Sequence, residues 1–224
     1  MRRIAFYLLT TGLGFLNACS SIDVKSVENP EILYTEGVKN IEKGRFIEAL
    51  EYVGEIRRRF PQSKFAPLAE LRTADIYFEQ ESFTEAAAAY GVFVELYPTH
   101  AEAPYAQYRR ALSYLNDAPD VVARDQTPAA EALRAAEIAT TRYASSPFAA
   151  QAKELVVKAR VKLAEKEAYI ARFYAKKGFD QASVGRWKAL VGVYADLRSV
   201  EQMKNVFEEA DRALAKASEA STKN

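Results

Sequence analysis

Two stretches that lie 37 residues apart decide how this chain folds: Gly44-Arg45-Phe46-Ile47-Glu48-Ala49 and Glu81-Ser82-Phe83-Thr84-Glu85-Ala86. In each copy a helical pattern stops at a short polar turn and a second helical pattern follows. The second pattern ends at an aromatic residue and a proline, Phe60-Pro61 and then Tyr97-Pro98. Proline stops a helix because it lacks the N–H and clashes with the preceding turn. The chain therefore repeats a pair of antiparallel helices, and the small alanine after each turn lets the two helices pack closely.

A third copy keeps this register in its first helix and loses it in its second. Ala111 lies 37 residues after Ala74, whereas Ala132 lies 46 residues after Ala86. We therefore expect nine inserted residues, within about 116–127, where two prolines and several Asn and Asp residues suit an extended turn. A period of this length and content is typical of tetratricopeptide repeats.

Beyond Pro147 the strict period ends, and the pattern predicts one long helix. It runs without a helix breaker from Phe148 to Lys177, and Gly178 ends it. A further helix follows, and then a polar-faced helix from about Ser199 to Ala217, which a repeat array needs as a cap. No strand-like alternation occurs. The predicted fold is all α: a right-handed solenoid of tetratricopeptide-like hairpins with one long helix and a capping helix.

The N-terminus has the pattern of a secretory signal. A basic start precedes a short apolar run, and Leu16-Asn17-Ala18-Cys19 resembles a bacterial lipobox. That resemblance implies cleavage before Cys19 and a covalent lipid on it, N-acyl and S-diacylglycerol. Cys19 is the only cysteine, so it has no disulfide partner. The alternative is an ordinary signal peptide with an incidental cysteine.

The expected organisation has five parts. They are a lipoprotein signal peptide (1–18), a lipid-anchored flexible tether (19–29), three repeats (30–146), a long helix with a further repeat and cap (147–217), and a frayed tail (218–224).

Charge is balanced overall and uneven locally. The formal net charge of +1 argues against a polyanionic partner such as nucleic acid. Residues 67–103 hold seven acidic side chains and one basic, a balance of −6. Residues 153–188 hold ten basic and four acidic, a balance of +6. The two ends of the molecule should therefore carry opposite charge. The alternative is that both segments are only solvated outer faces.

Residues that could carry catalysis are scarce, so we expect neither an enzyme nor a cofactor. His100 is the only histidine and lies at a turn between repeats, where a capping role outweighs that of a general base. No set of His and Cys has zinc-site spacing, so no metal site is expected. Asp75 and Glu79 are four residues apart on a helix, a spacing that usually marks a solvated stripe.

The first helix of each hairpin should line a concave surface, and its aromatic residues suit an extended peptide. Aromatic rings bury a large area at little entropic cost. The alternative is that these side chains pack between the repeats. The residues predicted to form a peptide groove are Tyr34, Leu71, Asp75, Phe78, Tyr105 and Tyr108.

Several ordered motifs resemble the BamD family, the lipoproteins of the outer-membrane β-barrel assembly machinery. They are Leu96–His100, Tyr108–Leu112, the Arg124-Asp125 loop, and Leu163–Gly178 together with the lipobox. The chain departs from the family pattern at Lys166, at Tyr194-Ala195 and in its shorter C-terminus.

The resemblance implies a non-enzymatic scaffold, lipid-anchored at the periplasmic face of the outer membrane. The N-terminal repeats would receive β-signals, the C-terminal segments of unfolded outer-membrane proteins. The other half would dock the periplasmic domains of BamA through Arg186, Arg172 and Lys176, with other Bam lipoproteins as further partners. Arg186 could instead pair within the chain with a carboxylate such as Glu167. The alternative function is a repeat lipoprotein that recruits cell-wall hydrolases or synthases.

Overall fold

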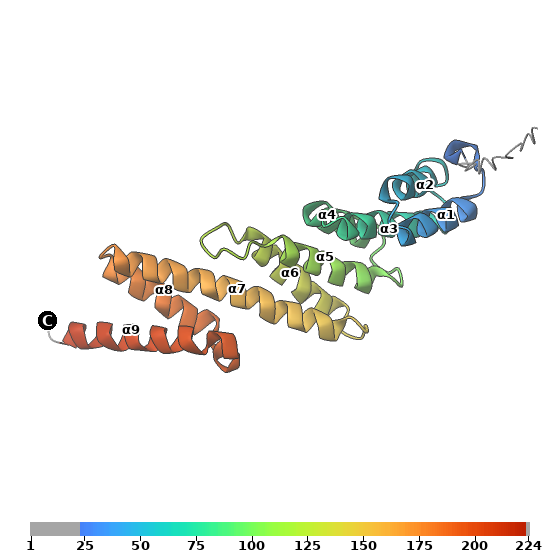
Figure 1. Ribbon diagram of the computed structural model, residues 1–224. Coiled ribbons are helices and arrows are strands. Elements are labelled where there is room, and N and C mark those ends of the chain that lie inside the picture. Colours follow the sequence, from blue (N-terminus) through green and yellow to red (C-terminus); the bar gives the residue numbers. More distant parts are fainter. Residues whose placement is uncertain (1–22, 223–224) are drawn as a thin grey trace, which may run out of the picture.

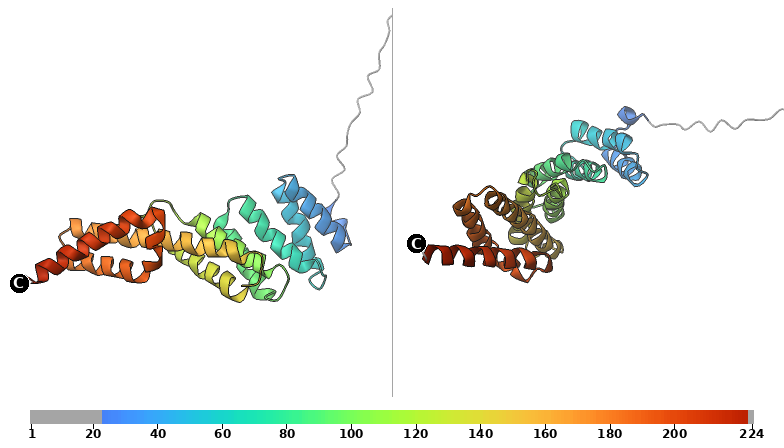
Figure 2. Two further views of the ribbon diagram at one scale, coloured as in Figure 1. Left: turned by 90° about the horizontal axis from the view of Figure 1, so that it is seen from below. Right: turned by 60° about the vertical axis from the view of Figure 1, so that its left-hand side comes forward.

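The computed structural model describes residues 23–222, in which all regular structure is helical. The helices form an elongated, curved array with the first and the last described helix at opposite ends (Figure 1, Figure 2). The α-helices are α1 (Pro30–Glu42), α2 (Phe46–Arg59), α3 (Ala66–Glu79), α4 (Phe83–Leu96), α5 (Ala103–Asp117), α6 (Thr127–Arg142), α7 (Ala149–Lys176), α8 (Asp180–Val193) and α9 (Lys204–Thr222). Three 3₁₀ turns accompany them: η1 (Val24–Ser26), η2 (Ala195–Ser199) and η3 (Glu201–Met203). The predicted all-α array of hairpins is confirmed, whereas the signal peptide and Cys19 lie outside the described residues.

The hairpin turns have the same backbone conformation at the positions that the repeat aligned. Gly44, Glu81 and Gly178 all have positive φ, at 68°, 57° and 77°. In each case the next residue donates its backbone N–H to a carbonyl five residues back, which closes the helix end. Glycine adopts this left-handed conformation without strain, whereas Glu81 adopts it at a cost.

Alanine makes the close contacts between helices. Ala49, Ala86 and Ala132, the three aligned alanines, have no exposed surface. The residues that α7 buries are also mostly alanine. The larger side chain of Phe173, near the C-terminal end of α7, is 47% exposed.

Helix α7 joins the two halves of the molecule. It has 28 residues, about 42 Å at 1.5 Å per residue. Helices α5 and α6 contact it on one side, and α8 and α9 contact it further along (Figure 1). The expected single helix from Phe148 to Lys177 is thus confirmed to within a residue at each end.

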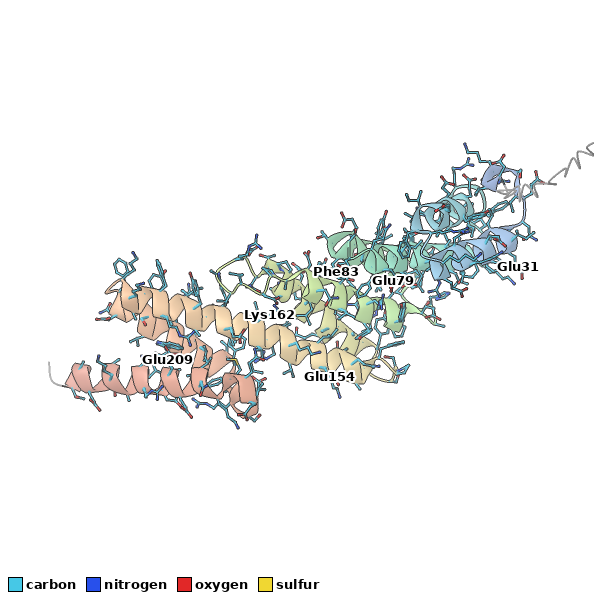
Figure 3. All side chains as sticks on the ribbon, viewed as in Figure 1. Glu31, Glu79, Phe83, Glu154, Lys162 and Glu209 are labelled. Atoms are coloured by element: carbon cyan, nitrogen blue, oxygen red, sulfur yellow. The ribbon has the colours of Figure 1, made fainter. Side chains whose placement is uncertain are left out.

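The loop between α5 and α6 is held against α7 by two lysines one turn apart. Lys162 Nζ lies 3.3 Å from the carbonyl oxygen of Pro119 and 3.1 Å from the Asp120 carboxylate. Lys166 Nζ donates to the carbonyl oxygens of Ala123 and Arg124, at 2.9 and 3.0 Å. Lys162 lies midway along α7 (Figure 3). The insertion in repeat three is therefore an ordered bridge to the second half.

The expected flexible tether is wrong for residues 23–29. Val27 is buried in the core of the first hairpin, and η1 precedes it. One terminal nitrogen of Arg59 donates to the carbonyl oxygens of Lys25 and Val27, at 3.0 and 2.9 Å. These contacts hold the segment against α2.

The expected cap helix and frayed tail also need correction. Two 3₁₀ turns occupy residues 195–203, and α9 begins only at Lys204. It continues to Thr222, through most of the segment expected to fray. Phe207 and Ala210 hold the first half of α9 in the core that it shares with α7 and α8. The second half of α9 continues beyond this core. Within residues 23–222, no helix has the length and apolar character needed to cross a membrane.

Candidate functional site

The concave faces of α1, α3 and α5 enclose two adjoining hollows, of about 690 and 280 Å³. Both are lined in part by Ile41 and Arg72, so they form one continuous groove, which we call the concave groove. The larger hollow is lined by Tyr34, Thr35, Val38, Lys39, Ile41, Glu42 and Arg72. The smaller is lined by Ile41, Phe46, Arg72, Asp75, Glu79, Tyr105 and Arg109.

A buried carboxylate organises the floor of the smaller hollow. Asp75 Oδ1 accepts hydrogen bonds from the hydroxyls of Tyr90, at 2.6 Å, and Tyr105, at 2.9 Å. Its other oxygen pairs with Arg72 on the same helix, and Arg72 Nε lies 3.3 Å from the Tyr34 hydroxyl. This cluster, the Asp75 hub, connects all three N-terminal repeats.

The hub keeps both of its central tyrosines protonated. Burial, reinforced by the negative charge of Asp75, raises the pKa of Tyr105 to about 12. The same causes, in the same order, raise the pKa of Tyr90 well above its ordinary value. Both hydroxyls therefore remain donors to Asp75 at neutral pH.

Arg109 covers the hub from α5. Its guanidinium carbon lies 3.6 Å from the centre of the Phe78 ring, and its Nε donates to the Tyr90 hydroxyl at 3.1 Å. It also lies 5.7 Å from the centre of the Tyr105 ring and forms an ion pair with Glu79, at 3.4 Å. The guanidinium is thus held flat on an aromatic ring at the wall of the groove.

The predicted groove residues divide into three groups. Tyr34, Asp75 and Tyr105 line the hollows. Phe78 lies beneath Arg109, while Tyr108 stacks on Phe148, with ring centres 5.8 Å apart. Leu71 was wrongly placed in the groove, because it has no exposed surface and belongs to the core between α3 and α4. Asp75 was wrongly placed on a solvated stripe, because it too is buried.

The sequence argument missed Arg72, Arg109 and Tyr90 as parts of this site. Arg72 had a recognisable pattern, since it lies three residues before Asp75 on one helical face. Arg109 lies four residues after Tyr105 and therefore shares the face that was predicted to be concave. Tyr90 comes from the second helix of its hairpin, which was not expected to reach the groove.

The residues predicted for docking at the other end make ion pairs within the chain. Arg186 lies 3.1 Å from Glu167, which is the intramolecular pairing that the sequence left open. Arg172 holds Glu209 of α9 through two nitrogens, at 2.6 and 3.0 Å. Much of the basic charge in this half is thus neutralised internally. The Arg186 side chain nevertheless remains 43% exposed.

The end of the molecule where α7 turns into α8 exposes aromatic and basic side chains together. Tyr169, Phe173 and Phe179 are 37%, 47% and 60% exposed. The Lys177 ammonium lies 5.9 Å from the Phe173 ring, and Lys176 is exposed beside it. We call these five residues the tip patch. Exposed apolar surface with a polar rim is typical of an interaction site.

Residues 23–222 contain no cluster of three or more His, Cys, Asp or Glu side chains suited to a metal ion. His100 accepts a hydrogen bond from the Glu102 N–H, at 3.1 Å, and its ring meets Phe93 edge to face. His100 therefore stabilises the turn before α5, but it is not the cap of that helix, whose N-cap is Glu102 and which has no side-chain cap.

This geometry defines a helical-repeat protein with a concave groove at one end and a patch of exposed aromatic and basic side chains at the other. The model of the YfiO family, described as "Outer membrane lipoprotein", matches residues 27–224, and the chain belongs to that family. The chain is 30% identical to the outer membrane protein assembly factor BamD of Neisseria gonorrhoeae, over 93% of this chain and 85% of that protein. It is 32% identical to the BamD of Caulobacter vibrioides over 72% of this chain and 52% of that protein, about half its length. Among solved structures, a chain titled "MamA RS-1 ArsTM double mutant" matches with a TM-score of 0.47 and 14% identity, over 88% of this chain and 99% of that one.

Proposed function

We propose that this protein is a non-enzymatic scaffold of outer-membrane protein assembly, lipid-anchored through Cys19 at the periplasmic face of the membrane. Its concave groove takes the β-signals of unfolded outer-membrane proteins. Its other end, at α7 and α8, docks the periplasmic domains of BamA. The observation that carries the proposal is an aromatic and arginine-lined groove in a family of outer membrane lipoproteins.

The groove suits an extended peptide that ends in aromatic residues. Tyr34, Ile41 and Tyr105 offer apolar surface along the two hollows, while the hub hydroxyls and guanidiniums supply polar contacts. Rigid aromatic side chains lose little entropy when they bind, which favours them as anchors.

Titration of a fluorescent β-signal peptide tests the groove. Tyr34→Ala should weaken binding by about tenfold or more, the effect of losing a central anchor. Phe78→Ala should weaken it as well, because the Phe78 ring supports Arg109 at the wall of the groove. Ile47→Ala is the matched control, because Ile47 is 72% exposed on α2, away from the lining of the groove. Unchanged affinity in both groove variants would remove the groove from the proposal.

The tip patch and Arg186 support docking at the opposite end. The patch combines exposed rings with lysines, and Arg186 presents a planar donor fork that can bind a partner carboxylate through two hydrogen bonds. The Glu167 pair positions this fork on the surface of α8.

A charge swap separates docking from internal pairing. Arg186→Glu should weaken the pull-down of BamA. The double variant Arg186→Glu with Glu167→Arg restores the internal ion pair, and with it the melting temperature of the protein. It should nevertheless still bind BamA weakly. If the swap also restores BamA binding, the role of Arg186 is internal and the docking site is misplaced. Recovery of a cell-wall hydrolase or synthase in place of BamA would favour the adaptor function.

The anchor is tested by Cys19→Ala. The variant should fold normally and leave the membrane fraction in cells that lack the other Bam subunits, because stable attachment needs several acyl chains. A variant that still sediments with membranes would contradict lipidation at Cys19.

A further inference from the structure

Two guanidinium groups line the smaller hollow of the concave groove, and their surroundings differ. Arg72 faces Asp75, which is 6% exposed and also accepts both tyrosine hydroxyls. That carboxylate compensates the charge of Arg72 within the hub. Arg72 therefore has its counter-ion in the floor of the hollow.

Arg109 is less well compensated. Its side chain is 17% exposed, and among the described residues its only ion pair is with Glu79, at 3.4 Å. The Glu79 side chain is 54% exposed, so water competes strongly for this carboxylate. Arg109 thus carries a largely desolvated charge whose ion-pair partner is loosely held, although the negative charge of Asp75 also acts on it.

The orientation of Arg109 does not depend on Glu79. The Phe78 ring supports the guanidinium plane from below, and the Tyr90 hydroxyl fixes its Nε. A guanidinium has five N–H donors in a rigid fork, and these two carboxylate and hydroxyl contacts leave donors unused. A carboxylate from a ligand could replace Glu79 without any rearrangement of Arg109.

We propose that Arg109 binds the terminal carboxylate of a client peptide, so that the groove recognises a free C-terminus. This inference rests on the proposed function of the groove. A chain end fits better than an acidic side chain, because Ile41, Phe46 and Tyr105 line the same hollow and offer apolar contact to the last side chain. The terminal carboxylate then meets Arg109 in two parallel charge-assisted hydrogen bonds.

A pair of β-signal peptides tests this, one with a free carboxylate and one with a C-terminal amide. Titrated against the mature chain, the free acid should bind about tenfold or more tightly than the amide. Arg109→Gln should abolish this preference, whereas Arg142→Gln is the control, since it removes the same charge from an exposed position on α6. Glu79→Gln should tighten the free acid severalfold relative to the amide, because it removes a competing carboxylate from an exposed site.

The outcomes distinguish this inference from the proposed function. Equal binding of acid and amide by the unaltered protein overturns the role of Arg109 and leaves the groove intact as a peptide site. An equal loss of both peptides in Arg109→Gln shows that Arg109 only supports the groove, which also overturns the inference. If neither peptide binds the unaltered protein, both proposals fail.

Discussion

Removing the carboxylate of Asp75 should destabilise the N-terminal half strongly. Asp75→Ala leaves the hydroxyls of Tyr90 and Tyr105 without their acceptor and Arg72 without its counter-ion. Each hydrogen bond to a charged group is worth about 1.5–3 kcal/mol. The Arg72 side chain is about a third exposed, so its ion pair adds little after screening by solvent. The two hydroxyl bonds to the carboxylate together give an expected loss of about 3–6 kcal/mol.

Thermal unfolding followed by circular dichroism measures this loss. In a protein of this size each kcal/mol shifts the melting temperature by about 2–4 °C, so Asp75→Ala should melt at least about 6 °C lower. Asp75→Asn keeps one oxygen as an acceptor and should fall between the alanine variant and the unaltered protein. Asp120→Ala is the control, because this carboxylate is fully exposed although it too is ion-paired.

A clear result would refute the reasoning. If Asp75→Ala melts within about 2 °C of the unaltered protein, the hub contributes no net stability and the burial of Asp75 must have another explanation. If Asp120→Ala costs as much as Asp75→Ala, the two losses do not reflect burial.

Three further expectations concern turns, the bridging loop and alkaline pH. Glu81→Gly should raise stability by about 1 kcal/mol and Gly44→Ala should lower it, because both positions have positive φ; opposite shifts in melting temperature would contradict this. Lys162→Met with Lys166→Met should speed amide hydrogen exchange in the loop between α5 and α6, and unchanged rates there would show that the two lysines do not hold it. The pKa of Tyr105 is raised to about 12 from an ordinary value of 10, so its stabilising effect is complete below pH 10 and disappears between pH 10 and 12. Tyr105→Phe should flatten the fall in melting temperature over that interval, and an identical fall would exclude Tyr105 as its cause.

The hairpins could be predicted because their determinants are local. Gly44 and Glu81 mark equivalent turns, and Ala49 and Ala86 mark equivalent close contacts, so a fixed spacing in the sequence revealed them. The long helix was equally accessible, since no helix breaker interrupts it before Gly178.

The site was only partly predictable because its contacts join distant segments. Asp75 and Tyr105 were recognised as concave-face residues, but Tyr90 meets Asp75 across its hairpin, and Arg109 meets Tyr90 only when the second and third hairpins stack. The ordered N-terminal segment escaped prediction for the same reason, since the side chain that holds Val27 is 32 residues away in the sequence. Local composition predicts a tether there, and the tertiary contact overrides it.

The length of α7 has a consequence for how the protein unfolds. In an array of independent hairpins, stability is the sum of repeat and nearest-neighbour terms, so the two ends can unfold separately. Here α5 and α6 pack on one part of a 28-residue helix, and α8 and α9 pack further along it. Disrupting either pair of helices exposes part of the alanine-rich face of α7, the helix against which the other pair packs. The segment from α5 to α9 should therefore unfold as one cooperative unit, leaving the first two hairpins as the part of the molecule that can open alone.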